Sequence, residues 1–405
     1  MTKPVSHLGA QVPSVDPSLA ARYLNIADLR EGARRRLPKG LFEFLDRGSE
    51  DELSLTGNRE AFRRVKLRNR VLVDVSKRNT QTELFGRPMS MPLAIGPTGA
   101  AGLTWYQGEL ELARAAAAFG VPFTLSTPST ASIETIATVE DGRNWFQLYV
   151  WNQRELSHAL VRRAQDAGFE ALIVTADTPV PSIREYNRRN GFTSPFSFNM
   201  RATMDVALHP RWFFGVLLRY LRTVGMPKNA HYPADSKGRM TSITGAASHL
   251  RGDSLTWEDL DRLREIWKGP LILKGVHLPE DARRSIDKGI DGIVVSNHGG
   301  RNLDSAVAPL DILPEIVAEV GGKTTVLLDS GVRRGGDILK ALALGADAVL
   351  SGRCALYGTA VAGQAGALHA LSILKKELDT SMAFTGCRSV ADAGERTVWL
   401  GRPHT

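Results

Sequence analysis

The sequence has few of the features that mark secreted, metal-binding or membrane-spanning proteins. Its 405 residues include only two cysteines, Cys354 and Cys387, which excludes a disulfide framework and favours a reducing compartment. The nine histidines show no spacing typical of metal ligands, so we expect no metal. No apolar run approaches the roughly 18 residues that a spanning helix needs. The first residues lack the pattern of a secretory signal, so we expect a cytoplasmic protein.

The net charge of +8 is concentrated in one stretch of the chain. Between Arg184 and Arg239, ten lysines and arginines face three acidic residues, a balance of +7. Such an excess suits nucleic acid, an anionic membrane surface or an acidic ligand, and equally a solvated loop. No nucleic-acid-binding module is recognisable around it, so we expect no nucleic-acid partner.

From residue 90 onward, short apolar runs alternate with helical patterns. Continuous apolar runs of this length are typical of parallel strands that are buried on both faces. Eight such units in order favour a (β/α)8 TIM barrel, an α/β fold, over an open doubly wound sheet. The expected strands are residues 92–95, 122–125, 145–150, 171–176, 271–274, 292–296, 325–329 and 348–351.

The spacing of the strands also divides the chain. Strand starts are regular except between strands four and five, where residues 178–255 form an insertion that contains the basic stretch. We expect residues 1–89 to cap the barrel, with a helix near 26–36 and strand-like pieces near 71–75. The barrel itself would span 90–390 and a tail 391–405.

In a barrel of this kind, functional groups gather at the carboxyl ends of the strands. Arg333 and Arg353 follow strands seven and eight beside glycines, where this fold usually binds phosphate. Polar residues at all eight strand ends indicate a large polar ligand.

His298 is the candidate base, because an imidazole titrates near neutrality and the glycines after it let a ligand approach. Asp177, at another strand end, would orient it. Arg184 and Arg301 could clamp a carboxylate by paired hydrogen bonds, and Lys274 could hold a developing negative charge on a ring system.

One segment resembles the active-site signature of the FMN-dependent L-2-hydroxy-acid oxidases and dehydrogenases: Ser296-Asn297-His298-Gly299-Gly300-Arg301, followed by Leu303-Asp304. The resemblance covers about residues 22–390. Within that family, residues 105–114 and 350–366 are most similar to the membrane-associated (S)-mandelate and L-lactate dehydrogenases. Further matching segments are Leu37-Pro38-Lys39, Gly96-Pro97-Thr98, Trp145-Phe146-Gln147-Leu148-Tyr149-Val150, Asp177-Thr178-Pro179, Leu273-Lys274-Gly275 and Asp329-Ser330-Gly331-Val332-Arg333-Arg334-Gly335.

The resemblance implies a role for each matched residue in the reaction. His298 would take a proton from the substrate, Asp177 would support the imidazolium, and Tyr149 would hydrogen-bond near the substrate oxygen. Arg184 and Arg301 would bind the substrate carboxylate. Reduction through a carbanion and through a hydride both remain open.

The resemblance also implies FMN as the cofactor, with Lys274 stabilising its reduced, anionic form. The other residues implied to bind FMN are Pro97, Thr98, Gly99, Ser126, Gln147, Thr175, Ser296, Asp329, Gly331, Arg333, Gly352 and Arg353.

Phe44 affects the binding of the substrate, and Gly99 affects the choice of electron acceptor. Phe44 stands where the family usually has a tyrosine that helps to bind the carboxylate, which removes about 1 kcal/mol of hydrogen bonding. Gly99 stands where oxidases of the family often have alanine and dehydrogenases tend to have glycine. We therefore expect a dehydrogenase that passes electrons to a quinone or cytochrome, and the substrate stays open between lactate, mandelate and longer hydroxy acids.

The insertion indicates where the enzyme would bind its electron acceptor, the quinone or cytochrome. Residues 212–218 are apolar and are flanked by Arg211, Arg219 and Arg222. Residues 205–228 could lie in a membrane interface, with apolar side chains inserted and arginines on anionic headgroups, or could pack on the barrel as a cap. The first alternative places the protein peripherally on the inner face of the cell membrane. The resemblance alone implies a homo-oligomer, a tetramer.

Two other functions compete with the dehydrogenase. One is an oxidase that uses the same site with O2 and releases H2O2. The other is a non-catalytic flavin-binding barrel, which the intact set of His298, Asp177 and Arg301 argues against.

Overall fold

The computed structural model describes residues 15–190, 200–232 and 253–401. The expected barrel is confirmed: parallel strands close on themselves, with Val349 of the last strand paired to Leu93 of the first. Each strand lies within two residues of its expected range. The strands are β4 (Leu93–Ile95), β5 (Phe123–Ser126), β6 (Asn144–Leu148), β7 (Ala171–Thr175), β8 (Leu271–Val276), β9 (Gly292–Val295), β10 (Thr325–Leu328) and β11 (Ala348–Ser351).

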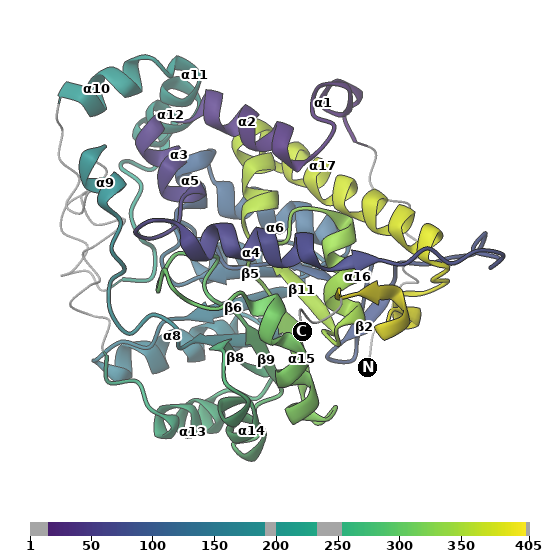
Figure 1. Ribbon diagram of the computed structural model, residues 1–405. Coiled ribbons are helices and arrows are strands. Elements are labelled where there is room, and N and C mark those ends of the chain that lie inside the picture. Colours follow the sequence, from purple (N-terminus) through teal and green to yellow (C-terminus); the bar gives the residue numbers. More distant parts are fainter. Residues whose placement is uncertain (1–14, 191–199, 233–252, 402–405) are drawn as a thin grey trace.

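Helices between successive strands cover the outside of the barrel (Figure 1). Local signals set their ends: Thr256 and Asp259 form a capping box at the start of α13, where the Thr256 N–H donates to Asp259 Oδ2 at 2.9 Å. The helices are α5 (Ala101–Thr104), α6 (Gly108–Phe119), α7 (Ile133–Ala137), α8 (Arg154–Asp166), α13 (Trp257–Ile266), α14 (Pro279–Asp287), α15 (Pro309–Val320), α16 (Gly335–Ala343) and α17 (Arg353–Thr385).

The strands are apolar throughout because each is buried on both faces. On β7, Ala171 and Ile173 belong to the core inside the barrel, whereas Leu172 and Val174 pack under the surrounding helices.

A hairpin closes the amino-terminal end of the barrel. It consists of β2 (Thr82–Leu84) and β3 (Arg87–Met89), and its turn residue Phe85 packs edge-on against Trp145 with 6.0 Å between ring centroids. Arg143 Nη2 donates to the Leu84 carbonyl at 3.0 Å and holds the hairpin in place. Ligands therefore reach the barrel from the opposite rim, where the strands end.

The N-terminal region is largely helical, with α1 (Pro17–Arg22), α2 (Ile26–Arg36), α3 (Lys39–Asp46) and α4 (Leu53–Arg64). The helix expected near 26–36 is confirmed. The strand-like pieces expected near 71–75 are wrong: the segment forms no strand, and Val71 and Leu72 are exposed. Apolar β-type residues make a strand only where a neighbouring backbone can pair with them.

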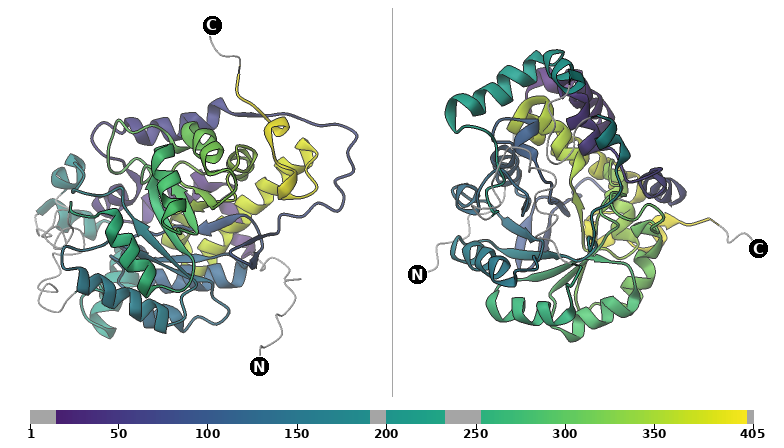
Figure 2. Two further views of the ribbon diagram at one scale, coloured as in Figure 1. Left: turned by 90° about the horizontal axis from the view of Figure 1, so that it is seen from below. Right: turned by 90° about the vertical axis from the view of Figure 1, so that its left-hand side faces the viewer.

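The C-terminal region returns to the N-terminal one. Helix α17 packs against α2 and α6, and its axis breaks at Ala362 and Gly363, which have non-helical backbone angles. After η3 (Val390–Asp392) and η4 (Glu395–Thr397), the strand β12 (Val398–Trp399) pairs antiparallel with β1 (Lys66–Leu67). Figure 2 shows α17, coloured light green to yellow, beside the purple N-terminal helices.

The insertion after β7 supplies a second helical layer. Its described parts are α9 (Glu185–Arg189), α10 (Met200–Ala207), α11 (Pro210–Trp212), the π-helical turn η1 (Phe213–Leu217) and α12 (Leu218–Thr223). Figure 1 shows α10, α11 and α12 on the same side of the molecule as α2. Residues 191–199 and 233–252 of the insertion lie outside the described ranges.

Candidate active site

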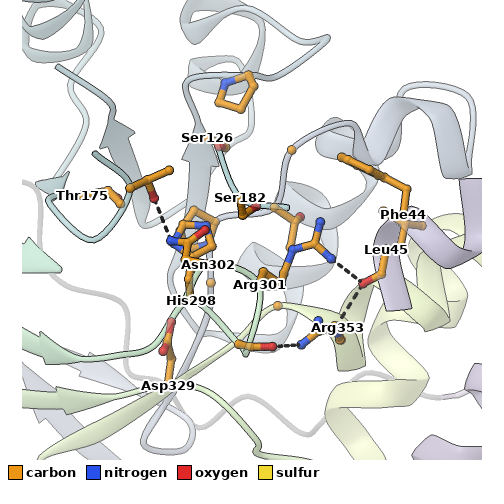
Figure 3. A pocket seen from close by; sticks show the side chains of 18 of the residues that line it. Phe44, Leu45, Ser126, Thr175, Ser182, His298, Arg301, Asn302, Asp329 and Arg353 are labelled. Carbon is orange, nitrogen blue, oxygen red and sulfur yellow. Dashed lines mark hydrogen bonds between the residues drawn. The ribbon is translucent and has the colours of Figure 1, made fainter. Parts of the chain in front are cut away.

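A cavity of about 820 Å³ opens at the carboxyl ends of the strands. It lies within the size range of small-molecule and cofactor sites. Side chains from several strand ends and from α3 point into it (Figure 3).

His298 lies at the centre of the rim, in the loop after β9. Its φ is +58°, a left-handed conformation that is uncommon outside glycine and asparagine. Nδ1 lies 2.8 Å from Asp177 Oδ1, and Nε2 lies 3.2 Å from the Tyr149 hydroxyl. Because a carboxylate only accepts, Nδ1 carries the proton and Nε2 is free to accept one.

Burial and the neighbouring charges favour a neutral His298 and an ionised Asp177. Burial lowers the pKa of His298, and Asp177 opposes that effect. Burial disfavours the Asp177 carboxylate, but Lys274 and His298 together hold its pKa well below the usual range. A neutral imidazole beside an ionised carboxylate is the arrangement of a general base.

Lys274 is buried at the end of β8. Its Nζ lies 3.3 Å from Asp329 Oδ2 and 3.6 Å from Asp177 Oδ2, and donates to Ser296 Oγ at 2.7 Å. Although burial disfavours the ammonium, the two carboxylates raise the pKa of Lys274 above its ordinary value. Ser296 Oγ also accepts the His298 N–H at 3.1 Å, so the lysine and the base share one anchor.

Two arginines approach each other at the outer part of the cavity. Arg184 Nη2 donates to the Arg301 carbonyl at 2.9 Å, and Arg301 Nη1 donates to the Arg47 carbonyl at 3.0 Å. Burial, together with the charge of Arg184, lowers the pKa of Arg301 to about 10. Two guanidinium groups so placed favour an anion between them.

A second pair, Arg333 and Arg353, lies in the loops after β10 and β11. Arg353 lies beside Arg301, since Arg353 Nη2 and Arg301 Nη1 both donate to the Arg47 carbonyl, at 3.2 and 3.0 Å. Arg353 donates to the carbonyls of Leu45 and Gly299 at 3.0 and 2.9 Å, as Figure 3 shows. Burial and the charges of Arg301 and Arg333 lower the pKa of Arg353 to about 10. This end of the cavity is therefore strongly cationic.

A row of neutral polar groups lies on the neighbouring strands β5, β6 and β7, where they line the same cavity. Ser126 Oγ donates to Gln147 Oε1 at 2.9 Å, and Gln147 Nε2 donates to Thr175 Oγ1 at 2.9 Å. A Cβ on Gly352 would lie 3.0 Å from Thr98 Cγ2, so the glycine keeps this part of the wall close to the backbone. A cationic end, a polar row and a buried lysine together fit the phosphate, ribityl chain and ring of FMN.

The structure brings nearly all the expected site residues to one cavity. Asp177 and Ser296 stand behind its wall and act through His298 and Lys274. The expected residues that line it are Phe44, Pro97, Thr98, Gly99, Ser126, Gln147, Tyr149, Thr175, Arg184, Lys274, His298, Arg301, Asp329, Gly331, Arg333, Gly352 and Arg353.

Sequence reasoning missed Asn302 and Asp304. Asn302 Nδ2 donates to the Asp177 carbonyl at 2.7 Å and ties the loop after β7 to the loop after β9. Buried Asp304 accepts from the N–H groups of Asp51 and Ser54 at 3.0 and 3.2 Å, which anchors α4 to the same loop. Their signal was present, since both lie in the segment that carries the family resemblance.

The insertion has two faces. Trp212, Val216 and Tyr220 are buried, and Trp212 Nε1 donates to the Leu103 carbonyl at 2.6 Å. The other face is apolar and exposed, with Met200, Met204, Leu208, Phe214, Leu221 and Val224 between 44% and 80% accessible. Within the described ranges, no helix has the length and apolar character needed to cross a bilayer.

Comparison with known proteins identifies the family. Residues 33–400 match the FMN-dependent dehydrogenases. The chain belongs to this family. It is 42% identical over 372 residues to the (S)-mandelate dehydrogenase of Pseudomonas putida, covering 92% of this chain and 93% of that one. It is 44% identical over 373 residues to an L-lactate oxidase of Nostoc sp., covering 91% and 96%.

A solved structure agrees. The monotopic membrane protein (S)-mandelate dehydrogenase superposes with a TM-score of 0.88 at 41% identity, covering 94% of this chain and 100% of that one. The family dependence on FMN and the fit of the cavity make this chain an FMN-dependent enzyme that oxidises 2-hydroxy acids.

Proposed function

We propose that the enzyme oxidises an L-2-hydroxy acid of the lactate or mandelate type to the 2-oxo acid and passes the electrons to a quinone or cytochrome. The observation that carries the proposal is the position of His298 Nε2, which faces the cavity beside Tyr149 and is backed by Asp177 at 2.8 Å. FMN, when bound, supplies the two-electron acceptor.

Each side chain then has one task. Arg184 and Arg301 bind the substrate carboxylate, and Phe44 packs beneath Arg301. The Tyr149 hydroxyl binds the substrate oxygen, and His298 Nε2 takes a proton from the substrate. The resulting imidazolium is stabilised by Asp177, which stays ionised throughout.

The remaining residues hold the cofactor. Lys274 would place a positive charge near the ring system of bound FMN and would favour its reduced, anionic form. Arg333 and Arg353 bind the phosphate with the loop that contains Gly352. The row formed by Ser126, Gln147 and Thr175 would hold the ring and the chain that joins it to the phosphate, together with Pro97, Thr98 and Gly99.

An anaerobic panel of 2-hydroxy acids tests the proposal. The oxidised flavin absorbance should bleach with an L-enantiomer such as L-lactate or (S)-mandelate and stay unchanged with the D-enantiomer. If no 2-hydroxy acid bleaches the flavin, the proposal is wrong.

The second candidate is an oxidase on the same site. The 44% identity to an L-lactate oxidase favours it, whereas Gly99 favours a dehydrogenase. Steady-state turnover with O2, compared with a soluble quinone at equal substrate, separates the two. Peroxide formed as fast as quinone is reduced would favour the oxidase.

We also propose that the enzyme binds peripherally to the inner face of the cell membrane as a homotetramer. Membrane binding is supported by the exposed apolar face of residues 200–224 and by the relative that is a monotopic membrane protein. The tetramer rests on the family resemblance alone. Light scattering of the purified protein gives the oligomeric state, and any state other than a tetramer contradicts the proposed homotetramer.

Vesicle flotation tests membrane binding. The double variant Phe214→Ser and Leu221→Ser should lose binding, because each removed side chain loses on the order of 2 kcal/mol of apolar burial. Leu400→Ser, at an exposed leucine near the C-terminus, is the matched control. Failure of the unmodified protein to float would refute the proposal.

A further inference from the structure

A second cavity, of about 650 Å³, lies away from the active site on the side that carries the insertion. Helices α1 and α2 form one wall, and the start of α11 forms the other. It is lined by Ser18, Leu19, Arg22, Tyr23, Asp28, Glu31, Gly32, Arg35, Arg36, Leu208, His209, Pro210, Arg211 and Val361.

Two arginines that line this cavity, Arg36 and Arg211, lie near each other. The charge of Arg211 acts on Arg36, whose Nε is buried and makes no hydrogen bond. Among the described residues, neither arginine forms an ion pair. Arg36 is held from two sides: its guanidinium lies 4.4 Å from the Trp105 ring centroid, and a Cβ on Gly215 would lie 3.6 Å from its Nη2.

The acidic side chains of the cavity already have partners on α2 or next to it. Glu31 accepts from Arg34 and Arg35 at 2.7 and 2.9 Å, and Asp28 Oδ2 accepts the Leu24 N–H at 2.8 Å. The residues outside the described ranges contain only one acidic side chain, Asp235. The chain therefore brings two positive charges together and has little of its own with which to neutralise them.

The surroundings indicate which anion would fit. Leu208 and Pro210 line the cavity, and Leu208, 76% exposed, also belongs to the apolar face of the insertion. A small soluble anion would contact the arginines only. A phospholipid carries a phosphate next to hydrocarbon, so it would contact both the arginines and the adjoining apolar surface. The cavity thus adjoins the surface that would meet a membrane.

We propose that this cavity binds the phosphate of an anionic phospholipid headgroup between Arg36 and Arg211. The inference rests on the membrane association proposed above and adds to it a specific site. Charge-assisted hydrogen bonds to both guanidinium groups would hold the phosphate, while the acyl chains would follow Leu208 onto the apolar face.

Flotation of the FMN-loaded enzyme on two kinds of vesicle tests the site. One kind is pure phosphatidylcholine, and the other contains phosphatidylglycerol. We expect Arg211→Gln and Arg36→Gln each to weaken binding to the phosphatidylglycerol vesicles by about tenfold or more. Arg222→Gln removes the same charge from the same region outside the cavity, and should weaken binding by about fivefold at most.

The outcomes separate the two proposals. If the unmodified enzyme binds neither vesicle, membrane association itself fails. If the unmodified enzyme binds both vesicles equally, the site is refuted and apolar insertion accounts for binding. If Arg211→Gln and Arg222→Gln weaken binding to the phosphatidylglycerol vesicles by the same factor, the site is also refuted and diffuse electrostatic attraction accounts for binding. Thermal unfolding checks that Arg36→Gln remains folded, and Arg211→Gln tests the site independently.

Calorimetry measures the affinity of the enzyme for inorganic phosphate alone. A micromolar affinity would overturn the lipid assignment in favour of a soluble anion.

Discussion

The ring of Phe44 lies beneath the guanidinium of Arg301, with 5.3 Å between the arginine Cζ and the ring centroid. This contact orients the arginine but offers no hydroxyl to the substrate. Phe44→Tyr would add one hydrogen-bond donor at the edge of the cavity. We predict that KM for the hydroxy acid falls about fivefold, the equivalent of one neutral hydrogen bond, while kcat changes little.

Steady-state kinetics with the best substrate of the panel measure this change. Phe42→Tyr, on the same helix but buried in the core, is the control for adding a hydroxyl to α3. An unchanged KM in Phe44→Tyr would mean that the ring edge does not reach the carboxylate.

His298→Gln should separate flavin binding from flavin reduction. The amide cannot accept the substrate proton, so the anaerobic reduction rate should fall by about 10²- to 10⁴-fold. FMN should remain bound, because the cofactor contacts assigned above come from other residues. Stopped-flow absorbance measures the rate, and His158→Gln on the outer helix α8 is the control. Reduction at the normal rate would show that another group is the base.

The pH dependence follows from the protonation state of His298. Only the neutral imidazole accepts a proton, so kcat/KM falls as the pH drops through the pKa of His298. Burial holds that pKa below its ordinary value of 6.5, so the acidic limb should lie below pH 6.5. Because Asp177 raises the pKa of His298, Asp177→Asn should move the limb to still lower pH.

The same variant should also slow the reaction. Without the carboxylate, the imidazolium formed in the reaction loses its stabilising partner, and the limiting rate should fall about 100-fold or more. A pH profile of kcat/KM for both proteins measures both effects. A limb that moves to higher pH would contradict the assigned coupling.

Gly99 should influence the electron acceptor. A Cβ at this position would lie 3.2 Å from Pro128 Cγ and 3.3 Å from the Pro128 carbonyl, so alanine must displace the wall of the cavity slightly. Since the oxidases of the family often have alanine here, we predict that Gly99→Ala raises the ratio of O2 to quinone turnover several-fold. Peroxide and quinone assays on the same preparation measure the ratio, and a lower ratio would contradict the prediction.

Much of this site was predictable because the responsible signals are local. A strand buried on both faces is apolar throughout, and a closed parallel barrel then brings every strand end to one rim, so His298 and Lys274 could be placed together. Other features depend on contacts between distant segments. Asn302 lies in the segment that resembles the family, but nothing local indicates that its partner is the Asp177 carbonyl, 125 residues away. The outward face of 200–224 could be assigned only after Trp212 was seen to pack on Leu103.

Lys274 should matter to stability as well as to catalysis. Its ammonium lies between Asp177 and Asp329, at 3.6 and 3.3 Å, and all three side chains are largely buried. Lys274→Met would leave two carboxylates facing each other in a site of low dielectric, at a cost of about 3 kcal/mol in the free energy of unfolding. Adding Asp329→Asn to that variant removes one of the repelling charges and should restore part of the loss, without restoring flavin reduction. Denaturant unfolding of the two variants measures the stability, and anaerobic reduction measures the chemistry. If the second substitution lowers stability further, the carboxylate pair is not the source of the loss.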